Sequence, residues 1–196
     1  MPISWTGGWQ SAANGPEGQA VAGIKLEPMG EGQITTLMSW LPNRQQCLQW
    51  GGPNFRYPFD RASFLEDCYW RELQGYVINN SGDEMLAFGQ YYERRGRCHL
   101  GRLIVAPNHR GAGLGKILIT LLAQTGSRAL NTTECSLFVL RANLPARGLY
   151  EKLGFVETAC REQSERPHLC DFMVAPVEAL CNNEKLLTGQ RYKLVG

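Results

Sequence analysis

The chain has 196 residues, of which 43% are hydrophobic and 19% are charged, and its formal net charge is +2. This composition is ordinary for a soluble globular protein, and the length suits one domain with a substantial core. The small net charge argues against the strongly basic surface expected of a protein that binds nucleic acid or an anionic membrane.

Seven cysteines are present, an odd number, and no two of them form a C-x-x-C pair. Several fall within apolar stretches, where a thiol behaves as a small hydrophobic group. We therefore expect neither a metal site nor a disulfide framework, and a reducing cytoplasm fits this usage. No apolar run approaches a membrane span, and the N-terminus lacks a basic region followed by an apolar core.

The N-terminal quarter combines a predicted arm, a strand and a helix. Residues 1–22 are rich in Gly, Ala and Ser and predict a flexible arm. A strand is predicted over 23–29, and a helix over 30–41 ends at Pro42.

An aromatic loop over residues 50–59 follows. Such a loop forms either a binding wall or a lid that packs on the core. The first alternative makes Trp50, Phe55 and Tyr57 candidate substrate-binding residues.

The next segment predicts a helix and two strands. Asp60 can cap a helix over 61–73, and strands over 75–79 and 85–92 flank a turn rich in Asn, Gly and Asp. With the strand that follows, three antiparallel strands precede the most distinctive stretch of the chain.

That stretch runs from Cys98 to Gly126 and reads as a strand, a glycine-rich turn and a helix. The apolar strand over 98–106 ends at Pro107. The helix carries leucine and isoleucine at the i, i+3, i+4, i+7 spacing of one buried face, and Gly126 is its predicted C-cap.

The turn between them, residues 110–115, has glycine at every second position. Glycine permits positive φ and close approach of a ligand, and the first turn of a helix offers free N–H groups, so this turn predicts a phosphate site. A Walker loop fails here because Ile117 stands where Ser or Thr is needed. A dinucleotide fingerprint fails because Lys116 replaces its last glycine. The pattern [Q/R]-x-x-G-x-[G/A] fits.

A second motif lies in residues 135–155. A short strand over 135–140 leads to Asn143, which can cap a helix that ends at Gly154. The spacing V-x-x-x-N-x-x-A-x-x-x-Y-x-x-x-G-F is matched in register by six residues, namely Val139, Asn143, Ala146, Tyr150, Gly154 and Phe155. Together the two motifs resemble those of the GCN5-related N-acetyltransferases, the GNAT superfamily.

The resemblance implies an α/β fold with three layers, in which a central, mostly antiparallel sheet carries helices on both faces. Helices interleaved with hairpins and crossovers support a mixed α/β sheet independently. We expect the acetyltransferase domain over residues 23–175. Within it, strands over 156–161 and 169–174 would pair, and a tail over 176–196 would be partly helical.

The resemblance also implies transfer of acetyl from acetyl-CoA to a primary amine by direct attack. The backbone of three residues would pair with the pantetheine arm of coenzyme A, and Asn143 would hydrogen-bond to that arm; the three are Leu103, Ile104 and Val105. The pyrophosphate would be held by the glycine turn, that is by Arg110, Gly111, Ala112, Gly113, Leu114 and Gly115.

Two residues are predicted to be catalytic. Tyr150 is the candidate general acid for the departing thiolate. The resemblance places His99 at the strand position where histone-acetylating members of the family carry a glutamate base, and its imidazole suits proton removal at neutral pH, directly or through water. Glu93 is the rival base. Counting in steps of two places Arg102 on the strand face opposite His99, and it receives no role.

The prediction is therefore a cytoplasmic N-acetyltransferase that uses acetyl-CoA and acts on a small-molecule or peptide amine, without metal, nucleic acid or membrane. The resemblance allows a homodimer. The alternatives are a non-catalytic module that binds coenzyme A in the same fold, and an enzyme that transfers a longer acyl group.

Overall fold

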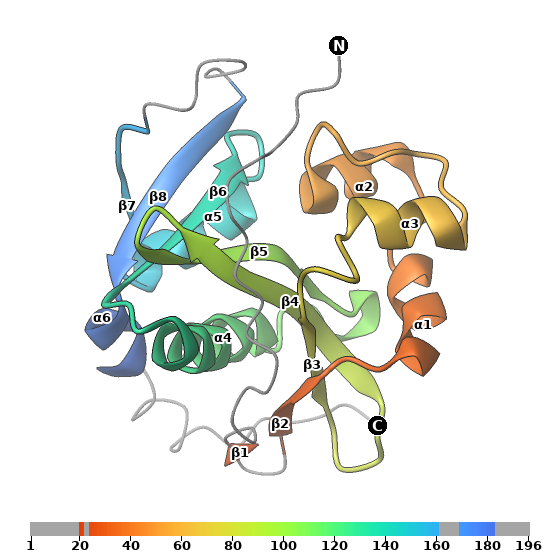
Figure 1. The fold of residues 1–196 in the computed structure, drawn as a ribbon, viewed down its shortest axis with the longest axis horizontal. Coiled ribbons are helices and arrows are strands. Elements are labelled where there is room, and N and C mark those ends of the chain that lie inside the picture. The colour runs from red at the N-terminus through yellow and green to blue at the C-terminus, as the bar shows by residue number, and fades with distance from the viewer. Residues whose placement is uncertain (1–19, 22–23, 161–168, 183–196) are drawn as a thin grey trace.

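The computed structural model describes residues 20–21, 24–160 and 169–182, which form one mixed sheet with helices on both faces (Figure 1). The described strands lie in the order β1-β2-β3-β4-β5-β6-β8-β7. All neighbours are antiparallel except β5 and β6, which run parallel. The predicted fold class is thereby confirmed. The strands are β1 (Ala20–Val21), β2 (Ile24–Pro28), β3 (Gly75–Asn79), β4 (Met85–Arg94), β5 (Arg97–Val105), β6 (Glu134–Leu140), β7 (Val156–Glu157) and β8 (Cys170–Pro176).

The described helices divide between the two faces of this sheet. They are α1 (Ile34–Ser39), α2 (Arg44–Gly51), α3 (Arg61–Asp67), α4 (Leu114–Leu130), α5 (Leu144–Lys152) and α6 (Val177–Asn182). The first three pack on one face, and α4, α5 and α6 pack on the other. Helix α6 lies in the predicted tail, of which residues 183–196 fall outside the described part of the chain.

The N-terminal boundary and the first helices differ from the prediction. Residues 20–21 were assigned to the arm, but Val21 pairs with Ile24 as the edge strand β1; the rest of the arm lies outside the described residues. Helix α2 was not predicted. Its N-cap is Asn43, whose side chain accepts a hydrogen bond from the Gln46 amide at 2.9 Å, and the helix has few apolar residues to reveal its periodicity.

Helix α4 is longer than predicted, because Gly126 does not end it. The helix continues to Leu130, and Asn131 forms the left-handed C-cap with φ of 52°. Gly126 instead allows close packing, since a Cβ there would lie 2.6 Å from Cys98 Sγ and 2.7 Å from the Tyr91 ring. The glycine therefore serves the contact between helix and sheet.

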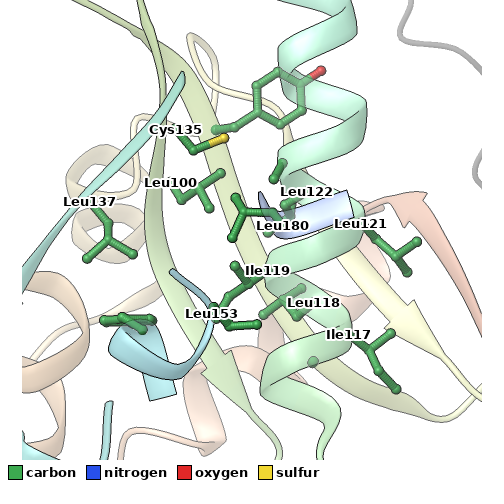
Figure 2. Packing of buried hydrophobic residues seen from close by; sticks show 14 of the residues in the cluster. Leu100, Ile117, Leu118, Ile119, Leu121, Leu122, Cys135, Leu137, Leu153 and Leu180 are labelled. Atoms are coloured by element: carbon green, nitrogen blue, oxygen red, sulfur yellow. The ribbon is translucent and has the colours of Figure 1, made fainter. Parts of the chain in front are cut away.

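Two hydrophobic cores result from the alternation of side chains along the strands. Val77 of β3 faces the core under α1–α3, while its neighbours Tyr76 and Ile78 face the core under α4. Figure 2 shows the second core, in which Leu118 and Leu122 of α4 lie near residues of β5 and α6. The sheet between these cores holds β5 and β6 in the middle of the molecule.

Candidate active site

The glycine turn lies where β5 ends and α4 begins. Gly111 and Gly113 both have φ of 82°, a left-handed conformation that favours glycine, and Gly113 is the N-cap of α4. The Lys116 amide donates to the Gly113 carbonyl at 3.0 Å, so the N–H groups of Leu114 and Gly115 are the ones that have no acceptor within the helix. The exposed Arg110 adds a positive charge, and its Nε donates to the Val105 carbonyl at 3.3 Å. This arrangement is suited to binding a phosphate.

A wedge opens between β5 and β6 beside this turn. The two strands are in register at only two residue pairs, Cys98 with Cys135 and His99 with Ser136. Beyond His99 they diverge, although β6 stays paired with β8 up to Leu140. Residues 101–105 are half-buried despite their central position in the sheet. On the side of β6, the backbone of Leu103, Ile104 and Val105 therefore has no strand partner, and this unpaired edge runs from the glycine turn to an apex at His99.

Tyr150 lies on α5, the helix that follows β6 and reaches the start of α4. Its neighbour Leu149 packs against Gly115, where a Cβ would be only 3.1 Å from the Leu149 side chain. Tyr150 is buried beside Phe155. Among the described residues nothing hydrogen-bonds to its hydroxyl, and burial alone raises its pKa to about 12. The phenol is therefore protonated throughout the physiological range.

His99 forms the apex together with Ser136. Its Nδ1 lies 2.9 Å from the Ser136 hydroxyl, and its ring packs among three aromatic rings, those of Tyr92, Phe138 and Phe172. The side chain is 3% exposed. Burial, with a smaller effect from the charge of Arg94, lowers its pKa to about 3. His99 is thus neutral at physiological pH and has little affinity for a proton, which makes it a poor general base.

Glu93, the rival base, is held elsewhere. Its carboxylate accepts a hydrogen bond of 2.6 Å from the Gly96 amide in the turn between β4 and β5. On β4 it shares a face with Tyr91, which packs under α4, and not with Tyr92, which contacts His99. The structure therefore gives Glu93 a role in the turn.

Arg102 lies on the same face as His99, contrary to the prediction. Gln90 pairs with Gly101 and Phe88 with Ile104, so Gly89 alone opposes both Arg102 and Leu103. This β-bulge adds one residue to β5 and reverses the alternation of side chains after it. Arg102 takes a left-handed φ of 50°, and its Nη1 donates to Gln90 Oε1 at 2.9 Å.

The predicted aromatic wall packs mainly as core. Trp50 and Phe55 are buried, with ring centroids 5.2 Å apart, and the Trp50 indole donates to the Arg102 carbonyl at 2.7 Å. Tyr57 is half-buried and donates to the Pro42 carbonyl. Asn143 caps α5 by accepting from the Ala146 amide at 3.4 Å. None of these four residues is brought to the apex by a contact in the described structure.

Sequence reasoning missed the side chains that do surround the apex. Tyr92 and Phe138 pack on His99, and Arg94 lies over the Phe138 ring at 5.1 Å from its centroid. These residues come from β4 and β6, at positions with no motif. Only the pairing of the strands brings them together, so no local sequence signal could have found them.

A separate open cavity of about 500 Å³ lies at the other end of β5. Residues of α1, of the turn before β4 and of the segment 106–109 line it. It contains neither His99 nor Tyr150. Its lining has none of the predicted site residues, so we attach no catalytic role to it.

Comparison with known proteins agrees with this geometry. The sequence model of the acetyltransferase (GNAT) family matches residues 44–155. Spermidine N(1)-acetyltransferase of Vibrio cholerae is 24% identical over 141 residues, which cover 68% of this chain and 79% of the relative. Glucosamine 6-phosphate N-acetyltransferase of Trypanosoma brucei brucei is 30% identical over 97 residues, covering 48% of this chain and 61% of the relative.

Solved structures show the same fold. The crystal structure of Vibrio cholerae spermidine N-acetyltransferase in complex with CoA and spermine superimposes with a TM-score of 0.64 at 20% identity, covering 81% of this chain and 98% of that one. No helix in the described ranges is long and apolar enough to cross a membrane, and these ranges contain no group of three His, Cys, Asp or Glu residues placed to hold a metal.

The two motifs, the wedge between β5 and β6 and the family match over more than half of the chain point to one conclusion. The chain belongs to the acetyltransferase (GNAT) family and is an N-acetyltransferase that uses acetyl-CoA.

Proposed function

We propose that the wedge holds acetyl-CoA with its pyrophosphate on the glycine turn and its acetyl group at the apex. Residues 110–115 would bind the pyrophosphate through backbone N–H groups and the charge of Arg110. The pantetheine arm would pair with the free edge of β5 at Leu103, Ile104 and Val105 and would receive a hydrogen bond from Asn143. The observation that carries this proposal is the loss of pairing between the strands beyond His99. An arm that leaves the turn along this edge ends near His99.

In this proposal Tyr150 stabilises the departing thiolate by donating a hydrogen bond. Its pKa of about 12 exceeds that of a thiol, about 8.5, by a margin that makes full proton transfer uphill by roughly 5 kcal/mol. A fixed hydroxyl that has no protein partner among the described residues can nevertheless point at developing negative charge. Tyr150 thus acts as a hydrogen-bond donor rather than as a full acid.

We propose that water removes the proton of the ammonium. His99 would instead have a structural role, in which it holds Ser136 and the aromatic rings around it in place. A histidine with a pKa of about 3 cannot hold that proton at neutral pH. The charge of Arg94, which contributes to lowering the pKa of His99, acts in the same direction on an ammonium placed nearby. It therefore favours the neutral amine that attacks the thioester.

The acceptor is proposed to be a primary amine of a small molecule or a peptide, which agrees with the spermidine, glucosamine 6-phosphate and N-terminal acetyltransferases among the relatives. Residues 23–175 are proposed as the catalytic domain. Dodecameric spermidine N-acetyltransferase among the structural neighbours supports an oligomer, such as a homodimer. The free cysteines support a reducing, cytoplasmic setting.

Calorimetric titration with acetyl-CoA tests the cofactor site, with two matched glycine variants. Gly111 and Gly96 have φ of 82° and 74°, and a Cβ at either position meets nothing within 4 Å. Replacement by alanine should cost each about 1–2 kcal/mol of folding free energy through backbone strain. Only Gly111→Ala should also weaken acetyl-CoA binding, by at least about tenfold, because two or more phosphate contacts depend on that turn.

Equal affinities of the two variants for acetyl-CoA would show that the glycine turn does not hold the cofactor. Both proteins should first be confirmed as folded by circular dichroism, so that the comparison concerns binding alone.

A further inference from the structure

Arg102 is a partly buried cation on the face of β5 that carries His99, and no carboxylate in the described part of the chain balances its charge. Its Nη2 donates to the Asp67 carbonyl at 2.6 Å, at the end of α3, and its guanidinium lies 5.5 Å from the centroid of the Tyr69 ring. The Asp67 carboxylate is engaged by Arg56 instead. Within the described residues no carboxylate forms an ion pair with Arg102, and its Nε is buried without a hydrogen-bond acceptor.

The backbone of Arg102 is held in an unusual conformation to place this side chain. A left-handed φ of 50° costs a non-glycine residue free energy, and such strain tends to persist where the position serves a function. The strained residue is the extra one in the β-bulge of β5. The bulge directs the guanidinium to the face of the sheet that carries His99, where it contacts Gln90 of β4 and the end of α3.

A second arginine lies on this face of the sheet. Arg94, on β4, is half-buried over Phe138 of β6, and its charge acts on His99. The charges of both arginines also act on Tyr92. A polyamine would bring a second positive charge toward Arg102, whereas an oxyanion would accept hydrogen bonds from the remaining N–H groups of its Nη atoms.

We infer that the acceptor is a primary amine that also carries an oxyanion, either a carboxylate or a phosphate, and that the guanidinium of Arg102 binds this oxyanion. The inference rests on the proposed function, because it requires the acetyl group to lie at the apex. The amine and the oxyanion must be close enough for one molecule to reach both the thioester and Arg102.

Matched amines test the inference on the unmodified protein. The rate of thiol release from acetyl-CoA is measured with β-alanine against β-alaninamide, and with O-phosphoethanolamine against ethanolamine; 1,4-diaminobutane serves as the cationic probe. At least one anionic member should exceed its neutral partner in kcat/KM by about 10- to 100-fold, the effect of one charge-assisted hydrogen bond. The preferred pair distinguishes a carboxylate from a phosphate.

Variants then assign the preference to Arg102. Arg102→Gln should abolish the difference within the preferred pair and leave the dissociation constant of acetyl-CoA within about twofold, and Arg102→Lys should restore part of it. Lys25→Gln removes one charge from the exposed face of β2 and should change neither value. If Arg102→Gln does not fold, the pair ratios of the unmodified protein and of Arg102→Lys decide.

Several results would overturn the inference alone. These are equal rates within both pairs, faster reaction of 1,4-diaminobutane, a preference that survives in Arg102→Gln, or no reaction with any of these amines while acetyl-CoA binds. Failure of acetyl-CoA to bind would instead overturn the proposed function, and the inference with it.

Discussion

Replacing Tyr150 with phenylalanine separates its chemical role from its role in packing. The side chain is 8% exposed, and its hydroxyl has no hydrogen-bond partner among the described residues. Phenylalanine retains the ring that packs on Phe155, so the variant leaves no protein group unsatisfied. We expect the free energy of unfolding to change by less than about 1 kcal/mol.

The chemical effect of this substitution should be much larger. A hydrogen-bond donor directed at developing negative charge is worth about 10²- to 10³-fold in rate, so kcat of Tyr150→Phe should fall by about that factor. The affinity for acetyl-CoA should stay within about twofold, because the ground-state thioester sulfur is a weak acceptor.

Stopped-flow or continuous thiol detection gives kcat, and calorimetry gives the affinity. The pH profile adds a second check, since a phenol with a pKa of about 12 stays protonated at pH 10, where an ordinary tyrosine would be half ionised. The unmodified enzyme should therefore show no loss of kcat from this group up to about pH 10.5. A variant that keeps more than a third of the kcat, or that loses affinity and kcat in parallel, would refute the assignment.

Three further predictions concern stability. Gly126→Ala should destabilise the protein by about 2 kcal/mol through overpacking. Gly148→Ala, where a Cβ meets nothing within 4 Å, should stabilise it by about 0.5–1 kcal/mol. Urea titrations that give equal shifts of the midpoint for the two variants would contradict the close packing of α4. Asp171→Asn should cost about 2 kcal/mol in the same assay, because the buried carboxylate pairs with Arg141 and Arg147, and an unchanged midpoint would show that the pairs contribute nothing. Because the folded-state pKa of His99, about 3, lies below the usual 6.5, the unfolded state binds more protons between these values. Stability should be full above pH 6.5 and fall on acidification toward pH 3, and His99→Gln should flatten this slope; identical slopes would argue against a neutral buried His99.

Local features of the chain were readable from the sequence because they depend on neighbouring residues. The glycine turn was predicted with its helix start, and Gly113 is the N-cap of α4. Strand β3 has its predicted bounds, and Asn143 caps α5 as expected. A cap or a turn is formed within about four residues, so its sequence carries the whole signal.

Predictions that relied on regular counting failed where tertiary contacts changed the pattern. Gly126 has the sequence character of a C-cap, but the approach of Cys98 and Tyr91 gives it another role. Arg102 was placed on the wrong face because period-two counting cannot detect a β-bulge.

By itself, then, the sequence determined the family, the order of most elements and the turn that is suited to phosphate, since each of these resides in contiguous motifs. Only the tertiary structure decided what surrounds the reacting centre. His99 lost its basicity because rings from three strands remove it from water, and Arg102 gained its position from a bulge between β4 and β5. Desolvation and cross-strand contacts depend on residues far apart in the chain, which no local pattern records.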